Sequence, residues 1–248
     1  MAMTLSLTKD EIMESQKRLA RTAGVLYLAV AILAGFAVGF VRTLIYVPGD
    51  PAATAANIAA NEGLFRLGFL ADLTQATLML FIAMALYLLL QHVNTNVARA
   101  MVVIVAISVA IQALNLAPSF TTLGIATDPD YTAAFGADGA DSLVMVLLDL
   151  QQNGFLIAQV FFGLWLLPLG YLVLRSTMFP MALGVLLIIA CFSYLIHLPF
   201  MFLWPEVGTL LTPIIAVPAI AAEVWMVFYL LIKGVKAPKP VDHALAVA

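Results

Sequence analysis

Charged residues are scarce in this chain. Lysine, arginine, aspartate and glutamate together make up 10% of its 248 residues, whereas soluble domains carry roughly 25%. Hydrophobic residues make up 64%. A water-soluble core of this size cannot bury so much apolar surface, so lipid must surround most of the chain. The few basic residues form no dense cluster, which argues against a nucleic-acid-binding protein.

Cysteine and histidine are equally scarce. The single cysteine, Cys191, excludes a disulfide within the chain, and its apolar neighbours favour a packing role. The three histidines show no metal-ligand spacing. The sequence also lacks a nucleophile elbow, a phosphate-binding glycine loop and the HExxH and CxxC motifs. We therefore expect no metal, no cofactor and no catalytic residue, and an intramembrane enzyme is the least favoured hypothesis.

Long apolar runs are what the chain has in abundance. Crossing a bilayer takes about 20 apolar residues, and six runs are long enough. They cover residues 22–41, 64–90, 98–122, 142–174, 178–199 and 210–233. The first run lacks a small-residue cleavage site, so we expect it to remain as a membrane span. The sequence predicts an all-α integral membrane protein, with a six-transmembrane-helix bundle over residues 22–236.

The distribution of basic residues predicts the orientation. Nine of the 11 lysines and arginines fall in the tails and loops of one side, and acidic residues dominate the loops of the other. By the positive-inside rule, both termini are cytoplasmic. Residues 1–21 then form a cytoplasmic amphipathic segment, with a helix that lies on the membrane surface before turning into the first span. Residues 237–248 form a flexible cytoplasmic tail.

Local signals describe the first span and the outer loops. Gly35 and Gly39 form a small-xxx-small face that suits close helix packing. In the outer segment GDPAATAANIAANEG, Asp50 can cap a short helix that has Pro51 at its first position. The outer stretch ATDPDYTAAFGADGAD carries four aspartates without EF-hand spacing, so a solvated loop is favoured over a calcium site.

Prolines and a histidine mark the later spans. Pro168, Pro213 and Pro218 fall inside spans, where a missing backbone donor produces kinks. His197 stands at the end of the fifth span and is expected to be a membrane-interface residue.

Polar side chains inside the spans are the candidates for function. Asp72, Asp149 and Glu223 lie on spans two, four and six, where a carboxylate costs roughly 2.5–3.5 kcal/mol at a helix centre. The amides that lie on these helices or on span three, at helical spacing, are Gln75, Gln112, Asn115, Gln152 and Asn153. Since polar faces avoid lipid, we expect these side chains to converge inside the bundle.

Two functional hypotheses follow from this polar lining. In the first, it is a hydrated pocket that binds or transports a small polar or cationic ligand, or protons, with Asp149 and Glu223 as the charge carriers. This hypothesis predicts a cavity that contacts at least two carboxylates. In the second, the polar groups only form inter-helix hydrogen bonds, each contributing about 0.6 kcal/mol, in a structural or stress-related membrane protein.

Two arginines flank the outer end of the first hairpin. Arg66 is expected to pair with Glu62, four residues before it, and Arg42 to reach lipid headgroups. The alternative is that both form the mouth of the pocket with Asp149, and Arg66 is therefore included among the candidate ligand-binding residues. The expected partners are membrane lipids and a small-molecule ligand.

Several strings resemble a known family. GDPAATAANIAANEGLFRLGFLADL, LDLQQNGF and AEVWMVFYLLIKGVK are similar to the bacterial six-span family catalogued as domain of unknown function 4386, from about residue 21 to residue 236. The resemblance implies a multi-pass protein of a bacterial inner membrane and no particular activity. Gln151 stands where that family often has His, and His197 where it often has Asp, which weakens an Asp/His metal or acid–base scheme. The family's landmarks correspond here to Gly49, Asp50, Asn57, Arg66, Asp149, Gly154, Phe161, Phe162, Gly163, Gly170, Tyr171, Ser176, Pro180, Gly184, Tyr194 and Glu223.

Overall fold

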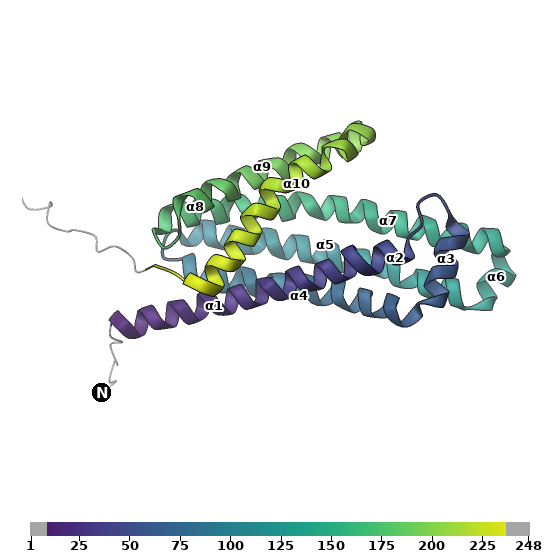
Figure 1. The fold of residues 1–248 in the computed structure, drawn as a ribbon, viewed down its shortest axis with the longest axis horizontal. Coiled ribbons are helices and arrows are strands. Elements are labelled where there is room, and N and C mark those ends of the chain that lie inside the picture. The colour runs from purple at the N-terminus through teal and green to yellow at the C-terminus, as the bar shows by residue number, and fades with distance from the viewer. Residues whose placement is uncertain (1–8, 237–248) are drawn as a thin grey trace, which may run out of the picture. The chain divides into compact units, whose positions relative to one another are not determined.

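The computed structural model describes residues 9–236, which are mostly helical and contain no strand (Figure 1). Six stretches are long and apolar enough to cross a membrane. They are Met13–Ile45, Glu62–Leu90, Thr95–Thr127, Ala137–Ser176, Met181–Leu203 and Pro205–Lys233. The prediction of an all-α fold with six spanning helices is therefore confirmed, and the chain is a multi-pass membrane protein. The predicted tail over residues 237–248 lies outside the described residues.

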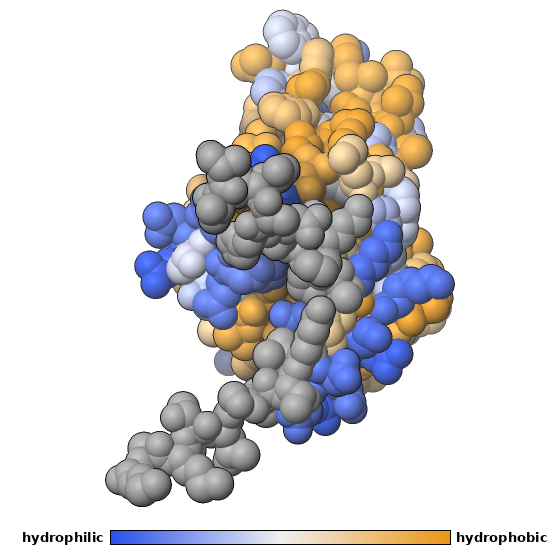
Figure 2. Space-filling model, turned by 90° about the vertical axis from the view of Figure 1, so that its left-hand side faces the viewer, coloured by the Kyte–Doolittle hydropathy of each residue, from blue (hydrophilic) through white to orange (hydrophobic). Residues whose placement is uncertain are grey.

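Large apolar side chains cover much of the surface. Leu114, Leu210 and Ile214 are 76%, 73% and 67% exposed, which would be costly in water and is favourable against lipid chains. Figure 2 shows one face of the molecule, where hydrophobic side chains gather in the upper part of the view. The described structure thus agrees with a lipid-facing exterior.

The first span is one continuous helical rod. Helix α1 (Lys9–Ala34) runs on into the π-helix η1 (Gly35–Arg42) and the short helix α2 (Thr43–Ile45). We expected a surface helix that turns before the span, but α1 continues unbroken past residue 21. The reason is that no glycine or proline interrupts the stretch before Gly24.

The expected packing face of Gly35 and Gly39 is not used. A Cβ added at either glycine would meet nothing within 4 Å, and both residues are exposed. Both lie in η1, where hydrogen bonds run from i to i+5. Side chains four residues apart therefore do not line up as they would in an α-helix, and the prediction of a close helix contact here is wrong.

The chain forms two compact units, each built from separate segments. Among the described residues, unit 1 comprises residues 9–25, 84–102 and 163–236, and unit 2 comprises residues 26–83 and 103–162. Three helices, α1, α4 (Glu62–Leu90) and α5 (Thr95–Thr127), contribute one part to each unit. Sequence analysis treated the spans as one bundle and did not foresee this division.

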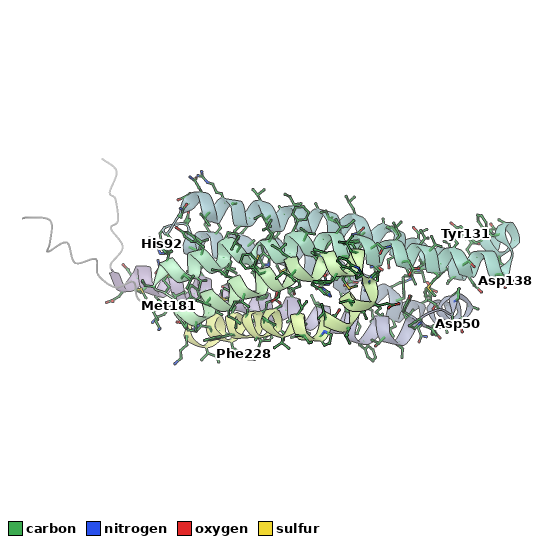
Figure 3. All side chains as sticks on the ribbon, turned by 90° about the horizontal axis from the view of Figure 1, so that it is seen from above. Asp50, His92, Tyr131, Asp138, Met181 and Phe228 are labelled. Carbon is green, nitrogen blue, oxygen red and sulfur yellow. The ribbon has the colours of Figure 1, made fainter. Side chains whose placement is uncertain are left out.

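One end of unit 2 is closed by the short helix α3 (Pro51–Ala60). As predicted, Asp50 caps it, because its Oδ1 accepts a hydrogen bond from the backbone N–H of Ala53 at 2.9 Å. Ile58 of α3 is fully buried in an apolar cluster with Ile45 and Phe65. Asp50, Tyr131 and Asp138 all lie at this end (Figure 3).

The acidic stretch over residues 126–141 is mostly exposed but only partly loop. It contains the helix α6 (Pro129–Phe135). Asp128 caps that helix, since its Oδ1 accepts from the N–H of Asp130 at 3.0 Å, and Pro129 takes the first position. Gly136, at φ +74°, then ends it. The same cap-and-proline pattern predicted α3 correctly, and it should have predicted α6.

The fourth predicted span is divided between the two units. Helix α7 (Ala137–Leu164) ends at the unit boundary, and α8 (Leu166–Ser176) begins after Trp165. Pro168 explains the break, because proline has no N–H to donate to the carbonyl of Leu164. In unit 1, α8 packs on α9 (Met181–Leu203) at Gly170, where an added Cβ would lie 2.9 Å from the carbonyl oxygen of Gly184.

The last two spans of unit 1 are joined by a buried histidine. His197 of α9 places Nε2 3.1 Å from the Gly208 carbonyl and 3.0 Å from the Thr212 hydroxyl, both on α10 (Pro205–Phe228). Our prediction of an interface histidine is therefore wrong, because inter-helix hydrogen bonds compensate its burial. Helix α10 continues through Pro213 and Pro218 and ends in the π-helix η2 (Tyr229–Lys233).

Candidate functional site

Unit 2 contains a partly open cavity of about 160 Å³, which we call the main cavity. Engineered apolar cavities of about 150 Å³ hold benzene, so this volume fits a small organic molecule. The cavity lies among η1, α2, α4, α5 and α7. Its polar lining consists of Arg42, Tyr46, Asp72, Ser119, Asp149, Gln151 and Gln152.

A glycine leaves space on α4 next to the Asp72 carboxylate. Gly68 stands one turn before Asp72, and both line the main cavity. A Cβ at Gly68 would lie 2.8 Å from Cγ1 of Val41 on η1. The glycine therefore lets the first span approach α4 closely and brings Arg42, the next residue after Val41, to the cavity.

Two carboxylates line the main cavity, as the ligand-binding hypothesis predicted. Asp72 is half-buried, and its Oδ1 accepts a hydrogen bond from Nε2 of Gln75 at 2.8 Å. Asp149 on α7 is exposed. Both are held on helices, which position a site more firmly than loops do.

Arg42 supplies the positive charge of the cavity. It is half-buried, and its Nη1 donates to Oε1 of Gln152 at 2.9 Å. It also lies close enough to Asp72 for electrostatic interaction. Sequence analysis favoured contact with headgroups, with the pocket as the alternative, and the structure supports the alternative. The main cavity thus carries two acidic side chains and one basic side chain.

A second, smaller cavity of about 30 Å³ adjoins the first and shares Arg42, Asp72 and Gln151 with it. Its volume is that of about one water molecule. Its remaining polar lining is Gln75, Gln112 and Asn115. Within residues 9–236, the buried Nδ2 of Asn115 has no hydrogen-bond partner. A water in the small cavity could accept a hydrogen bond from it.

Sequence analysis missed Gln151, which is buried and lines both cavities. We grouped Asp149, Gln152 and Asn153 on one face, but Asn153 is exposed and lines neither cavity. The cavities face the side of α7 that carries Gln151 and Gln152, and the next residue turns about 100° further round the helix.

Two other candidate residues also lie apart from the cavities. Arg66 does not line either of them, because its guanidinium pairs with Glu62 at 2.6 Å and lies over the Phe120 ring at 5.9 Å. Glu223 belongs to unit 1 and interacts with Tyr194 in that unit. The expectation that Glu223 shares a pocket with Asp149 is not met by either cavity.

The Arg66 ion pair should matter little for stability. Its side chain is 51% exposed and that of Glu62 is 46% exposed, and exposed helix pairs of this kind contribute about 0.3–0.5 kcal/mol. We expect Arg66→Gln to shift the free energy of unfolding in detergent by less than about 1 kcal/mol. Arg42→Gln is the matched comparison within the cavity. If Arg66→Gln lowered the free energy of unfolding as much as Arg42→Gln does, the assignment of Arg66 to a weak, exposed ion pair would be contradicted.

The two cavities have a mixed polar and apolar lining. They offer carboxylates, amides, hydroxyls and one guanidinium next to apolar side chains. Across residues 9–236, no group of three or more His, Cys, Asp or Glu side chains is placed to hold a metal ion.

Comparison with known proteins identified one family. The family described as Domain of unknown function (DUF4386) matches residues 22–234. No curated protein and no solved structure matched the chain.

Proposed function

Because the chain belongs to the DUF4386 family of unknown function, its role must be inferred from the cavities, and we propose that it binds and transports a small polar or cationic ligand through unit 2. One observation supports this most directly. The main cavity lies within spanning helices and is lined by Asp72, Asp149 and Arg42. Ionisable groups inside a membrane are costly and typically mark ligand or ion pathways.

The charges also support an orientation with both termini in the cytoplasm of a bacterial inner membrane. Unit 2 has only two basic residues, Arg42 and Arg66, whereas its closed end carries Asp50, Asp128 and Asp138. The other described basic residues all belong to unit 1. They are Lys9, Lys17, Arg18, Arg21, Arg99, Arg175, Lys233 and Lys236. By the positive-inside rule, the α3 and α6 end of unit 2 then faces outward.

Accessibility of the main cavity to water tests the proposal. Ser119 is 8% exposed and lines the main cavity, whereas Ser108 is 2% exposed and lines neither cavity. In a Cys191→Ser background, each serine is changed to cysteine and treated, in membranes open to both sides, with a membrane-impermeant cationic thiosulfonate. We expect Ser119→Cys to react at least about tenfold faster than Ser108→Cys, because water enters the cavity with the reagent. Equal, slow labelling of the two positions would overturn the proposal.

A structural role is the second candidate, and unit 1 favours it. There the buried His197 of α9 forms hydrogen bonds with Gly208 and Thr212 of α10. In that case Asp149→Asn and Glu223→Gln would leave a host's phenotype unchanged and lower only thermal stability in detergent. Loss of the phenotype by Asp149→Asn in a folded protein would count against a purely structural role.

A further inference from the structure

We propose that the ligand of the main cavity is a small organic monocation, namely a protonated amine that carries a compact apolar group. This inference rests on the proposed function and narrows it to one class of substrate. It follows from the charge of the lining, from the unpaired acceptors and from the apolar wall.

The charge of the lining comes first. Asp72 and Asp149 oppose a single guanidinium, that of Arg42. When all three are ionised the lining carries one net negative charge, and within a membrane such an imbalance is unfavourable. One monocation restores neutrality. An anion would meet two carboxylates and one arginine whose Nη1 already donates to Gln152, so electrostatic repulsion disfavours it.

The unpaired acceptors come second. Within residues 9–236, the carboxylate of Asp149 has no hydrogen-bond or ion-pair partner, and only Oδ1 of Asp72 accepts a hydrogen bond, from Gln75. Carboxylate oxygens form their strongest hydrogen bonds with charged N–H donors. An ammonium group has three such donors, so it can bond these free oxygens.

The apolar wall determines the rest of the ligand. Half of the lining is apolar, including Val41, Ile45, Leu148 and the aromatic rings of Phe65 and Phe69. A bare inorganic cation needs oxygen ligands on most sides, which this wall does not provide. An apolar group on the amine would bury its surface there, and the phenyl rings favour a nearby cation. The volume fits a group of about six carbon atoms.

A charge series of one molecular shape tests the inference. Benzylamine, benzyl alcohol and benzoate share a phenyl ring but carry a positive, a zero and a negative charge near neutral pH. Binding to the purified full chain in detergent is measured by calorimetry. We expect benzylamine to bind at least about tenfold tighter than benzyl alcohol, with benzoate weakest, because only the amine neutralises the lining.

Variants separate the cavity carboxylates from general surface charge. Asp72→Asn and Asp149→Asn should each weaken benzylamine at least about tenfold and leave benzyl alcohol unchanged, since the charged pair is lost and the apolar wall is kept. Asp138→Asn is the matched control, because Asp138 is an exposed aspartate of the same helix as Asp149 and lines neither cavity. It should change nothing.

Each result decides between the two proposals. If benzyl alcohol or benzoate bound as tightly as benzylamine, the proposal of an amine ligand would be overturned, and the cavity would remain a ligand site. Benzylamine binding that persists in both aspartate variants would also overturn it. If no probe binds while Ser119→Cys is labelled, the amine is wrong and the water-accessible cavity stands. If no probe binds and Ser119→Cys is not labelled, both proposals fail.

Discussion

Changing Gly154 to alanine should destabilise the protein, although the same change stabilises most helices. Alanine is favoured over glycine inside a helix by about 0.5–1 kcal/mol. At Gly154 on α7, however, an added Cβ would overlap the terminal amide atoms of Asn115 on α5. The overlap includes Cγ of Asn115, so turning the amide alone does not relieve it and the whole side chain must leave its present rotamer. Overpacking that displaces a side chain in this way costs about 1–3 kcal/mol. We therefore expect a net loss in the free energy of unfolding, measured by denaturant titration in mixed micelles.

A matched control and a double variant make this result specific. Gly124 of α5 is also helical, but a Cβ there meets nothing within 4 Å, so Gly124→Ala should be neutral or stabilising. Asn115→Ala removes the obstructing amide. In that background Gly154→Ala should lose most of its cost, giving a coupling energy of about 1–3 kcal/mol. A cost that persists without the amide would show that Asn115 is not what the new Cβ meets.

The Gly154 contact also links packing to the small cavity. Asn115 lines that cavity, and its Nδ2 is buried without a partner among residues 9–236. Its position is therefore determined less by hydrogen bonding than by the space that Gly154 leaves open. A methyl group at position 154 would push the amide away from α7, and it would change the small cavity before it changed the main one.

The features predicted correctly from sequence are those that depend on one segment at a time. Apolar run length gave the six spans, because bilayer thickness sets it. Asp50 with Pro51 gave α3, because a cap and a first-turn proline act locally. The prediction that carboxylates line a cavity also succeeded for Asp72 and Asp149, since polar side chains in a span avoid lipid.

The features missed are those that depend on neighbouring helices. Periodicity gives the angle between two residues of one helix, but the rotation of that helix against its neighbours remains undefined. Asn153 was therefore assigned to the cavity and Gln151 was not. The π-helix η1 is a second example, since no simple residue pattern marks the change from i+4 to i+5 hydrogen bonding. It altered the roles predicted for Gly35 and Gly39.

Glu223 was misplaced for a different reason, whereas Arg66 forms the ion pair with Glu62 that the sequence predicted. Sequence analysis assumed that every costly ionisable group in the spans faces the same interior. The chain instead forms two compact units, and Glu223 belongs to the one that does not contain the cavities. Arg66 satisfies its charge locally with Glu62, four residues away. Each group reduces its cost separately, so depth in the membrane alone does not indicate a shared site.

Arg42→Gln is expected to be the most damaging single change among the polar residues of the main cavity. It removes the only basic side chain of the lining and leaves Asp72 and Asp149 to repel each other. Removing one partner of a fully buried charge pair costs about 3–5 kcal/mol. Arg42 is half-buried, so we expect about 1–3 kcal/mol, measured as the free energy of unfolding in mixed micelles.

A second substitution that restores the free energy of unfolding identifies why Arg42→Gln is destabilising. If unbalanced negative charge is responsible, adding Asp72→Asn should recover at least half of the lost stability, since the two side chains are close enough for electrostatic interaction. Adding Asp138→Asn should recover nothing, because that aspartate lies outside both cavities. In addition, Arg42→Gln should tighten benzylamine binding, because the ligand then has no competing cation. Equal rescue by the two aspartate changes would mean that net charge of the whole chain, rather than the charge of the cavity, sets the stability.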